Sequence, residues 1–303
     1  MEKAIQRCRF VVVMVFVCLA FISQGYGAIS SWGDVQPHDP STWTSSTSAY
    51  IGKEAYGEMF ITEGSDVVAG YASLGYRSGV VGSATVDGAG SSWSCSENLF
   101  VGYYGQGTLN ISNGGIVGCK SGFIGRESDS MGTVSVDGAG SSLSCNWNIE
   151  VGDAGQGTLE ITNGGNVSCY RGYIGSGYDS RGEVSVDGAG SSWNCGYNLY
   201  VGGYYGQGIL EIINGGNVSC SGGYIGNGPG STGEVSVDGA GSRLSCDWNL
   251  YVGYEGLGML KITNGGLVKV DGTLKIISNE DGDSFVRMAT GGMLALQGDA
   301  DAN

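Results

Sequence analysis

The sequence predicts an all-β protein, a right-handed parallel β-helix (solenoid) of about ten coils with about 25 residues each. The first observation behind this prediction is a long repeat. The motifs Val-Asp-Gly-Ala-Gly-Ser and Asn-Gly-Gly each occur four times, and successive copies lie 50 or 51 residues apart. The first motif begins at Val86, Val136, Val186 and Val237, and the second at Asn113, Asn163, Asn214 and Asn264.

The second observation is that each long unit divides into two related halves. Residues 158–175 read TLEITNGGNVSCYRGYIG, and residues 183–202 read EVSVDGAGSSWNCGYNLYVG. Both halves contain an alternating strand, an Asn-Gly or Asp-Gly turn, a strand ending in Cys, a short turn, and a third strand ending in Gly. Three strands and three turns make one triangular coil, and parallel crossovers of this kind are right-handed.

The third observation is a hydrophobic period of two, which is typical of strands. Leu159, Ile161, Val167, Cys169 and Ile174 fall on one side of the chain, and Glu160, Thr162, Ser168 and Tyr173 fall on the other. The glycine that ends the third strand recurs nine times, which indicates a backbone conformation that a Cβ atom would obstruct. These glycines are Gly52, Gly75, Gly102, Gly125, Gly152, Gly175, Gly202, Gly226 and Gly253.

Stacking of the coils supplies the stability that a single coil lacks. We expect the coils to fill residues 33–283, with degenerate copies at Met59-Phe60-Ile61 and Ser41-Thr42-Trp43. Ten coils at about 4.8 Å each form a rod about 50 Å long. A β-propeller is the alternative fold, but a blade needs four strands of similar status rather than a doubled motif.

The first 28 residues differ in composition and have the plan of a secretory signal peptide. Lys3, Arg7 and Arg9 precede an apolar run from Val11 to Ile22, and small residues follow at 25, 27 and 28. About 12 apolar residues are too few for a transmembrane anchor. We therefore expect a signal peptide at 1–28, a repeat domain at 29–283, and a C-terminal cap or truncated tail at 284–303. No second apolar segment follows, so no membrane-spanning segment is expected in the mature chain.

The charge of the chain bears on its partners. Asp and Glu total 29 against 14 Lys and Arg, which gives a net charge of −15. Nucleic acid is therefore not an expected partner, because phosphate binding needs clustered basic residues.

The paired motifs GQGTLEITNGG and GEVSVDGAGSSW, closing in NLYVG, resemble the repeat of bacterial type V autotransporter passengers and of exported proteins that carry a PEP-CTERM sorting tail. The resemblance covers residues 41–270. It implies a Gram-negative bacterium, export, and a β-helix that is secreted or held at the outer cell surface. The family has no established catalytic residues to transfer. The sequence lacks the membrane β-barrel of autotransporters and the Pro-Glu-Pro tail, so we expect a truncated or a released product.

One column of the stacked coils consists of cysteines. Its members are Cys95, Cys119, Cys145, Cys169, Cys195, Cys220 and Cys246, with Ser45, Ala69 and Val270 in the outer coils. Their parity is inward, which favours a buried column of small apolar side chains. Disulfides between neighbouring coils are an alternative, although in-register strands strain such a bond. A metal site is a weaker alternative, because no His accompanies the thiols and a straight line of ligands is not tetrahedral. No cofactor is expected.

A second column is aromatic and points outward. Its members are Tyr50, Phe100, Phe123, Tyr173, Tyr200, Tyr224 and Tyr251, and it is interrupted by Ser73 and Glu150. Two interpretations remain open. The rings stack on one another and stabilise a sheet face, or they form a binding stripe for an extracellular glycan, a surface protein or a second copy of the chain.

Two further sets of residues have a structural interpretation. Asp87, Asp137, Asp187 and Asp238 lie in turns, where we expect side-chain hydrogen bonds to the backbone rather than calcium binding. Trp93 and Trp193 alternate with Leu143 and Leu244, and Trp147 and Trp248 follow the two leucines by four residues. This pattern suggests volume compensation between adjacent coils.

The sequence predicts a protein that is not an enzyme. The only histidine is His38, outside the repeats, and Arg126, Arg171, Arg181 and Arg243 are scattered over different coils. A lyase needs a base beside Arg or Lys, and a hydrolase needs a carboxylate pair. We expect a structural rod or adhesin-like passenger. The alternatives are a β-helix polysaccharide lyase or hydrolase, and a glycan-binding module that uses the aromatic column.

Overall fold

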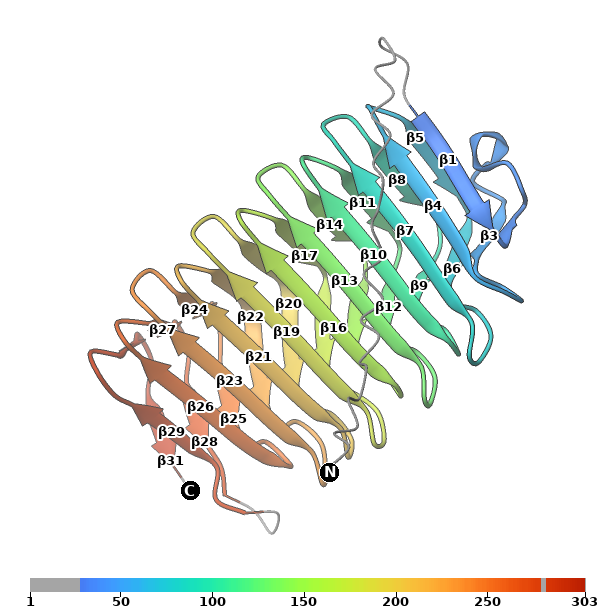
Figure 1. Ribbon diagram of the computed structural model, residues 1–303. Coiled ribbons are helices and arrows are strands. Elements are labelled where there is room, and N and C mark those ends of the chain that lie inside the picture. The colour runs from blue at the N-terminus through green and yellow to red at the C-terminus, as the bar shows by residue number, and fades with distance from the viewer. Residues whose placement is uncertain (1–27, 279–281, 303) are drawn as a thin grey trace, which may run out of the picture.

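The computed structural model describes residues 28–278 and 282–302 and shows a parallel β-helix (Figure 1). The chain winds in a right-handed sense from the N-terminal end of the rod to the C-terminal end, as the arrows and colours of Figure 1 show. Three sheets run along the axis, and each coil contributes one strand to each sheet. The predicted signal peptide lies outside the described residues, except for Ala28.

Sheet I contains the longest strands. In the described part of the chain it has 11 strands, of which β1 alone is antiparallel to its neighbour. The strands are β1 (Ala28–Gly33), β4 (Gly57–Thr62), β7 (Val81–Asp87), β10 (Gln106–Ser112), β13 (Met131–Asp137), β16 (Gln156–Thr162), β19 (Arg181–Asp187), β21 (Gln207–Ile213), β23 (Thr232–Asp238), β26 (Leu257–Thr263) and β29 (Phe285–Met288).

Sheets II and III form the other two faces. They join where β20 (Ser192–Val201) and β22 (Asn217–Ile225) continue through the corner between them. Sheet II also contains β5 (Asp66–Ala69), β8 (Ser92–Cys95), β11 (Ile116–Cys119), β14 (Ser142–Cys145), β17 (Asn166–Cys169), β24 (Arg243–Cys246), β27 (Leu267–Val270) and β30 (Met293–Leu296). Sheet III also contains β2 (Val35–Gln36), β3 (Ser48–Ile51), β6 (Tyr71–Leu74), β9 (Leu99–Val101), β12 (Gly122–Ile124), β15 (Asn148–Val151), β18 (Arg171–Ile174), β25 (Leu250–Val252), β28 (Leu274–Ile276) and β31 (Ala300–Ala302).

The coils stack in register, so equivalent residues lie over one another. Leu109 pairs with Val134, and Val134 pairs with Leu159. The residues expected to point inward, from Leu159 to Ile174, are at most 7% exposed. The predicted period of two and the predicted core are therefore confirmed, and one continuous apolar core fills the rod.

Volume compensation within the core is partly as predicted. Trp93 and Trp193 are fully buried. Coils with a large inward residue on sheet II alternate with coils that have an inward glycine on sheet III. Gly172 leaves room for Trp193 of the next coil, because a Cβ atom added at Gly172 would come within 2.7 Å of the Trp193 ring. The prediction was wrong for Trp147 and Trp248, which are 55% and 56% exposed. They lie in a turn, where the backbone leaves the alternation of the strands.

The turns between sheets I and II form hydrogen bonds with both neighbouring coils. Asp187 Oδ1 accepts a hydrogen bond of 2.7 Å from the side-chain amide of Asn214 on the following coil. Ser191 Oγ accepts one of 3.0 Å from the backbone N–H of Gly164 on the preceding coil. Asn214 has φ +52°, a left-handed conformation that Asn tolerates. The prediction of hydrogen bonds to the backbone was wrong about the partners, because the carboxylates of this column accept from Asn, Ser and Thr side chains of the next coil.

The N-terminal end departs from the predicted coil pattern. The segment Ser41-Thr42-Trp43 is not a strand, because Pro40–Thr42 forms a 3-10 helix that Asp39 caps. Ser45 is consequently exposed rather than inward. The strands β1 and β2 run antiparallel to β4 and β3. The regular parallel coils therefore begin later than residue 33.

The C-terminal segment continues the helix. Its strands β29, β30 and β31 pair in parallel with β26, β27 and β28. The boundary expected at residue 283 does not coincide with a change of architecture. None of the described residues belongs to a helix long and apolar enough to cross a bilayer.

The glycine at the end of each third strand generates a first prediction. Gly175 has φ +62°, and a Cβ atom there would overlap the carbonyl oxygen of Gln207 on the next coil. Gly175→Ala is therefore expected to lower the free energy of unfolding by at least about 2 kcal/mol. The measurement is equilibrium denaturation followed by circular dichroism.

The matched control is Gly118→Ala. A Cβ atom at Gly118 meets no atom within 4 Å, and its backbone is not left-handed. This variant should equal or slightly exceed the wild-type stability. Equal losses in the two variants would contradict the proposed role of Gly175.

Candidate functional site

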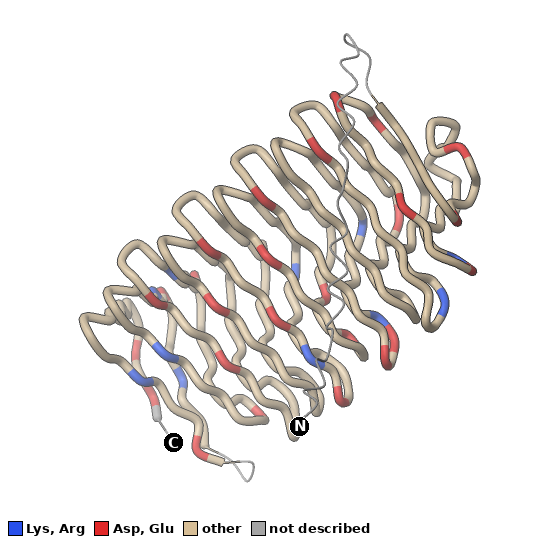
Figure 2. Tube along the Cα trace, in the orientation of Figure 1, with Lys and Arg blue, Asp and Glu red and all other residues tan. Residues whose placement is uncertain are grey.

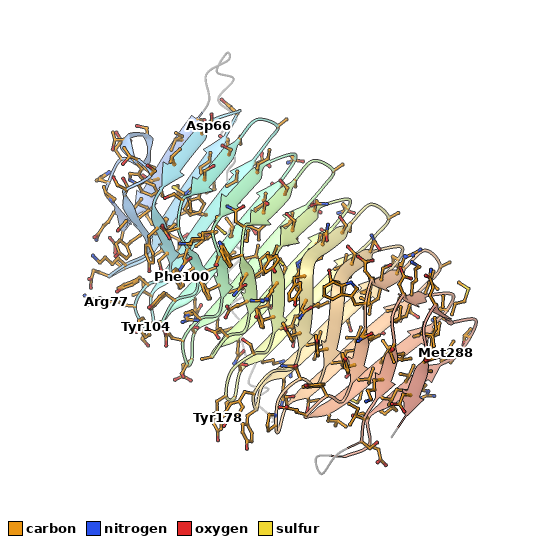
Figure 3. The ribbon with its side chains drawn as sticks, turned by 180° about the vertical axis from the view of Figure 1, so that it is seen from behind. Asp66, Arg77, Phe100, Tyr104, Tyr178 and Met288 are labelled. Atoms are coloured by element: carbon orange, nitrogen blue, oxygen red, sulfur yellow. The ribbon has the colours of Figure 1, made fainter. Side chains whose placement is uncertain are left out.

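The predicted aromatic column lies on the outer surface of sheet III, the face seen in Figure 3. In-register pairing places Tyr173, Tyr200, Tyr224 and Tyr251 on four consecutive coils. Their ring centroids are 4.9, 4.9 and 5.0 Å apart, with interplanar angles of 13°, 22° and 12°. Phe100 and Phe123 form a second stack at 4.9 Å and 9°. Tyr50 is separated from Phe100 by Ser73.

The stacked rings cover one another's faces. None of the seven aromatic side chains is fully exposed, and Phe100 is buried. Tyr71 and Tyr103 also pack on Phe100, with centroids 5.2 and 4.8 Å away. A sugar stacks on a free ring face, and within these blocks the faces are occupied by other rings. The geometry therefore favours the stabilising interpretation of this column over a binding stripe.

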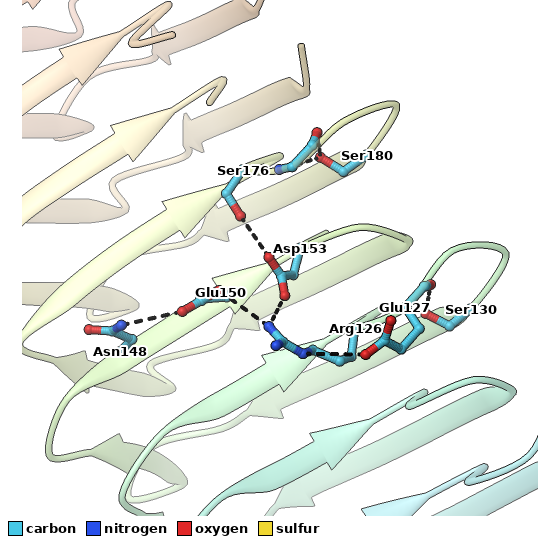
Figure 4. Close-up of polar contacts among 9 residues, drawn as sticks. Arg126, Glu127, Ser130, Asn148, Glu150, Asp153, Ser176 and Ser180 are labelled. Atoms are coloured by element: carbon cyan, nitrogen blue, oxygen red, sulfur yellow. Dashed lines mark hydrogen bonds and ion pairs between the residues drawn. The ribbon is translucent and has the colours of Figure 1, made fainter. Parts of the chain in front are cut away.

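A charged cluster occupies the gap between the two stacks (Figure 4). Glu150 takes the column position between Phe123 and Tyr173. Arg126 pairs with Asp153, lies 4.0 Å from Glu150, and places its guanidinium 4.6 Å from the centre of the Phe123 ring. The structure thus places Arg126, which the sequence analysis had treated as one of several scattered arginines, beside two carboxylates.

The electrostatics of this cluster are unusual. Burial, and then the negative charge of Asp153, raises the pKa of Glu150 to about 7. The amide of Asn148 donates a 3.3 Å hydrogen bond to Glu150 and opposes this shift. A carboxyl group that titrates near neutrality can exchange a proton. However, Arg126 is already engaged by Asp153 and Phe123, and the Glu150 side chain is only 16% exposed.

A sequence signal for this cluster existed. Arg126 and Asp153 each follow the glycine that ends a third strand, so they occupy one turn position on consecutive coils. Comparing that position between coils would have placed the two side chains together.

The cysteine column lies in the core, and the seven thiols are at most 7% exposed. Sulfur atoms approach at 2.8 Å between Cys119 and Cys145, and at 3.4 Å between Cys220 and Cys246. The seven cysteines are free thiols in the structure. Burial raises the pKa of the Cys145 thiol well above its usual range, which makes it a poor nucleophile and a small apolar side chain.

Most of the charged residues on sheet I and its turns are acidic (Figure 2). A depression of about 440 Å³ there is lined by Glu160, Glu183 and Glu211. Arg181 lies in the same depression and donates a 2.5 Å hydrogen bond to Glu183. In the described part of the chain no three His, Cys, Asp or Glu side chains are grouped as metal ligands would be.

The most exposed aromatic side chains of the repeats lie at the corners of the rod, and the sequence analysis missed them as a surface. Tyr178 and Tyr204 are 63% and 59% exposed in the turns between sheets III and I, where Figure 3 labels Tyr178. Trp147 and Trp248 project from the turns between sheets II and III. The sequence signal for these exposed side chains was an aromatic residue in a predicted turn, because the period of two gives no side-chain direction there.

The stacked block generates a second prediction. Tyr200 contacts a ring on each side, so Tyr200→Ala should lower the free energy of unfolding by about 2–3 kcal/mol. Denaturant titration of the purified protein measures the loss. The control is Tyr204→Ala, an exposed tyrosine whose removal should change stability by no more than about 0.5 kcal/mol. A loss that is no larger for Tyr200 than for Tyr204 would refute the stacking role.

The charged cluster generates a third prediction. Glu150 has an ordinary pKa near 4.5 and a folded-state pKa of about 7, so the folded protein binds this proton more tightly than the unfolded chain. The contribution of Glu150 is therefore most favourable below about pH 4.5 and is lost as the pH rises through 7. Glu150→Gln should raise stability at pH 8 by about 2–3 kcal/mol and leave it nearly unchanged at pH 4.

Denaturation curves at the two pH values measure this difference. The exposed Glu160→Gln variant serves as the control, with a small effect at both pH values expected. A Glu150→Gln variant less stable than wild type at pH 8 would mean that the ionised carboxylate stabilises the fold.

Comparison with known proteins gives little further information. No family model and no curated protein matches the chain. Among solved structures, the chain is similar to a crystal structure of a TibC-catalyzed hyper-glycosylated fragment of TibA, residues 55–350. The two share 18% sequence identity over 85% of this chain and 95% of that chain, with a TM-score of 0.33. At this TM-score the likeness carries no argument about family or function.

Proposed function

We propose that the protein is an exported, non-catalytic rod that acts as an adhesin-like module outside the cell of a Gram-negative bacterium. The observation that carries this proposal is a rigid rod with exposed aromatic side chains at its corners, among them Trp147, Tyr178 and Trp248. Exposed aromatic surface on a soluble protein is typical of a contact site for another molecule.

The architecture supports a role in which the rod holds a binding surface away from the point where the protein is attached. Coil-to-coil hydrogen bonds and a continuous core make the rod rigid, so that its surface presents side chains in fixed positions. Export and surface location are inferred from the predicted signal peptide and from the resemblance of the repeats to autotransporter passengers. The resemblance to PEP-CTERM-associated proteins has no support in the comparisons.

A second candidate function rests on the Arg126–Glu150–Asp153 cluster. Glu150, whose pKa is raised to about 7, and Asp153 beside it form a carboxylate pair of the kind that polysaccharide hydrolases use. The engagement of Arg126 by Asp153 and the enclosure of Glu150 between aromatic rings favour a structural role for the cluster.

The test of the proposed function combines binding and turnover. The full chain, processed by its own export route, is applied to arrays of glycans and to cells, and retention is measured. In parallel, polysaccharides are incubated with the protein and assayed for new reducing ends and for unsaturated products. Retention without turnover is expected. Turnover that is lost in Glu150→Gln would establish the enzymatic alternative, and an absence of retention on every surface would reject the adhesin-like role.

A further inference from the structure

Four aromatic side chains form a ridge at the corner between sheets II and III. This corner ridge consists of Trp147, Tyr170, Tyr197 and Trp248. The first three lie on consecutive coils, since the backbone N–H of Tyr170 donates to Trp147 O and that of Tyr197 donates to Tyr170 O. Trp248 lies two coils beyond Tyr197 and contacts its ring edge-to-face at 5.8 Å.

The ridge exposes more ring surface than the column of sheet III. Trp147, Tyr170 and Trp248 are 55%, 40% and 56% exposed. Trp147 meets Tyr170 nearly edge-on, with an interplanar angle of 76° and centroids 6.3 Å apart, so the two rings do not cover each other's faces. The ridge spans four coil steps, or about 19 Å, along the rod. Tyr170 and Tyr197 stack face to face in the middle of the ridge, whereas Trp147 and Trp248 keep more than half of their surface exposed, so the ridge offers two indole platforms on either side of a stacked pair.

An arginine is held against the middle of this ridge. The guanidinium of Arg171 lies 5.2 Å from the centroid of Tyr170 and 5.1 Å from that of Tyr197. These two rings stack on each other at 5.3 Å and 10°. No ion pair joins Arg171 to a carboxylate of the described residues, although the chain is strongly acidic. Two aromatic rings thus position a guanidinium that forms no ion pair among the described residues.

Two buried polar atoms beside the ridge lack hydrogen-bond partners. They are Nε of Arg171, a donor, and Oδ1 of Asn148, an acceptor. Asn148 and Arg171 are direct neighbours in the register of β15 and β18. A buried polar atom without a partner costs about 1–3 kcal/mol, so the polar groups beneath the ridge are not fully satisfied within the chain.

We propose that the corner ridge binds an acidic polysaccharide whose sugar rings stack on the aromatic platforms and whose carboxylates meet Arg171. The aromatic faces match the apolar faces of sugar rings, and the terminal Nη atoms of the Arg171 guanidinium donate to a carboxylate. This inference rests on the proposed function and specifies its ligand class and its site.

The experiment measures binding of the full chain to immobilised polygalacturonate and, as the neutral comparison, to dextran. Arg171→Ala should weaken binding to polygalacturonate by about tenfold or more, as expected for loss of a charge-assisted hydrogen bond. Arg171→Lys should restore part of the affinity, because it keeps the charge and loses the fork geometry. The double variant Trp147→Ala, Trp248→Ala should also weaken binding, and its exposed positions make a folding defect unexpected.

The matched controls remove an arginine and an aromatic residue from other places on the rod. Arg243→Ala removes an outward arginine of sheet II that bonds Ser245, and Tyr204→Ala removes an exposed tyrosine from another corner. Both should bind polygalacturonate as wild type does. Circular dichroism verifies the fold of every variant.

The outcomes separate the site from the proposed function. Wild-type affinity for polygalacturonate in folded Arg171 and tryptophan variants would overturn the inference, and so would equal affinity of the wild type for dextran. If the variants no longer bind polygalacturonate but still adhere to cells, the proposed site is supported and adhesion uses a further surface. If the wild type adheres to cells but not to polygalacturonate, the inference fails alone, and if it binds nothing, both fail.

Discussion

In-register stacking of parallel coils is the constraint on which the rest of this structure depends. Backbone hydrogen bonds between coils hold equivalent residues about 4.8 Å apart, so each position must be compatible with its own neighbours along the rod. This requirement explains why the repeat has a double period. Asp187 lies beside Asn214 rather than beside a second carboxylate, and Trp193 packs over Gly172 rather than over a second bulky residue. Alternation of two coil types avoids repulsion between like charges and overlap of large side chains.

The same constraint identifies positions where chemistry departs from the pattern. Aromatic residues tolerate their own copies well, because rings at coil spacing stack face to face. Glu150 interrupts that stack, and the cost of burying its charge beside Asp153 appears as a raised pKa, which Arg126 partly offsets. A break in a column is therefore more informative about special chemistry than the column itself.

Faces and corners of the rod have different capacities for binding. On the flat sheets, side chains are confined between equivalent side chains, and even aromatic residues such as Phe100 are covered. At the corners the backbone turns outward and the neighbouring side chains diverge, so that Trp147 and Trp248 expose their rings. A rod of this kind exposes its aromatic side chains mainly along its edges, and the sheets form the support between them.

The sequence by itself determined the fold, the inward and outward positions of the strands, and the glycines at left-handed positions, because a 25-residue repeat with a period of two admits few other arrangements. It also gave the membership of the cysteine and aromatic columns. Only the tertiary structure decided how exposed those columns are, where Trp147 projects, and that Arg126 meets Glu150 and Asp153. The physical reason is that strand periodicity fixes side-chain direction, whereas turns have no such period, and exposure depends on neighbours from other coils. The antiparallel strands β1 and β2 and the 3-10 helix at the N-terminal end were also decided only by the tertiary structure. They lie outside the regular repeat, where no period indicates the direction of the side chains.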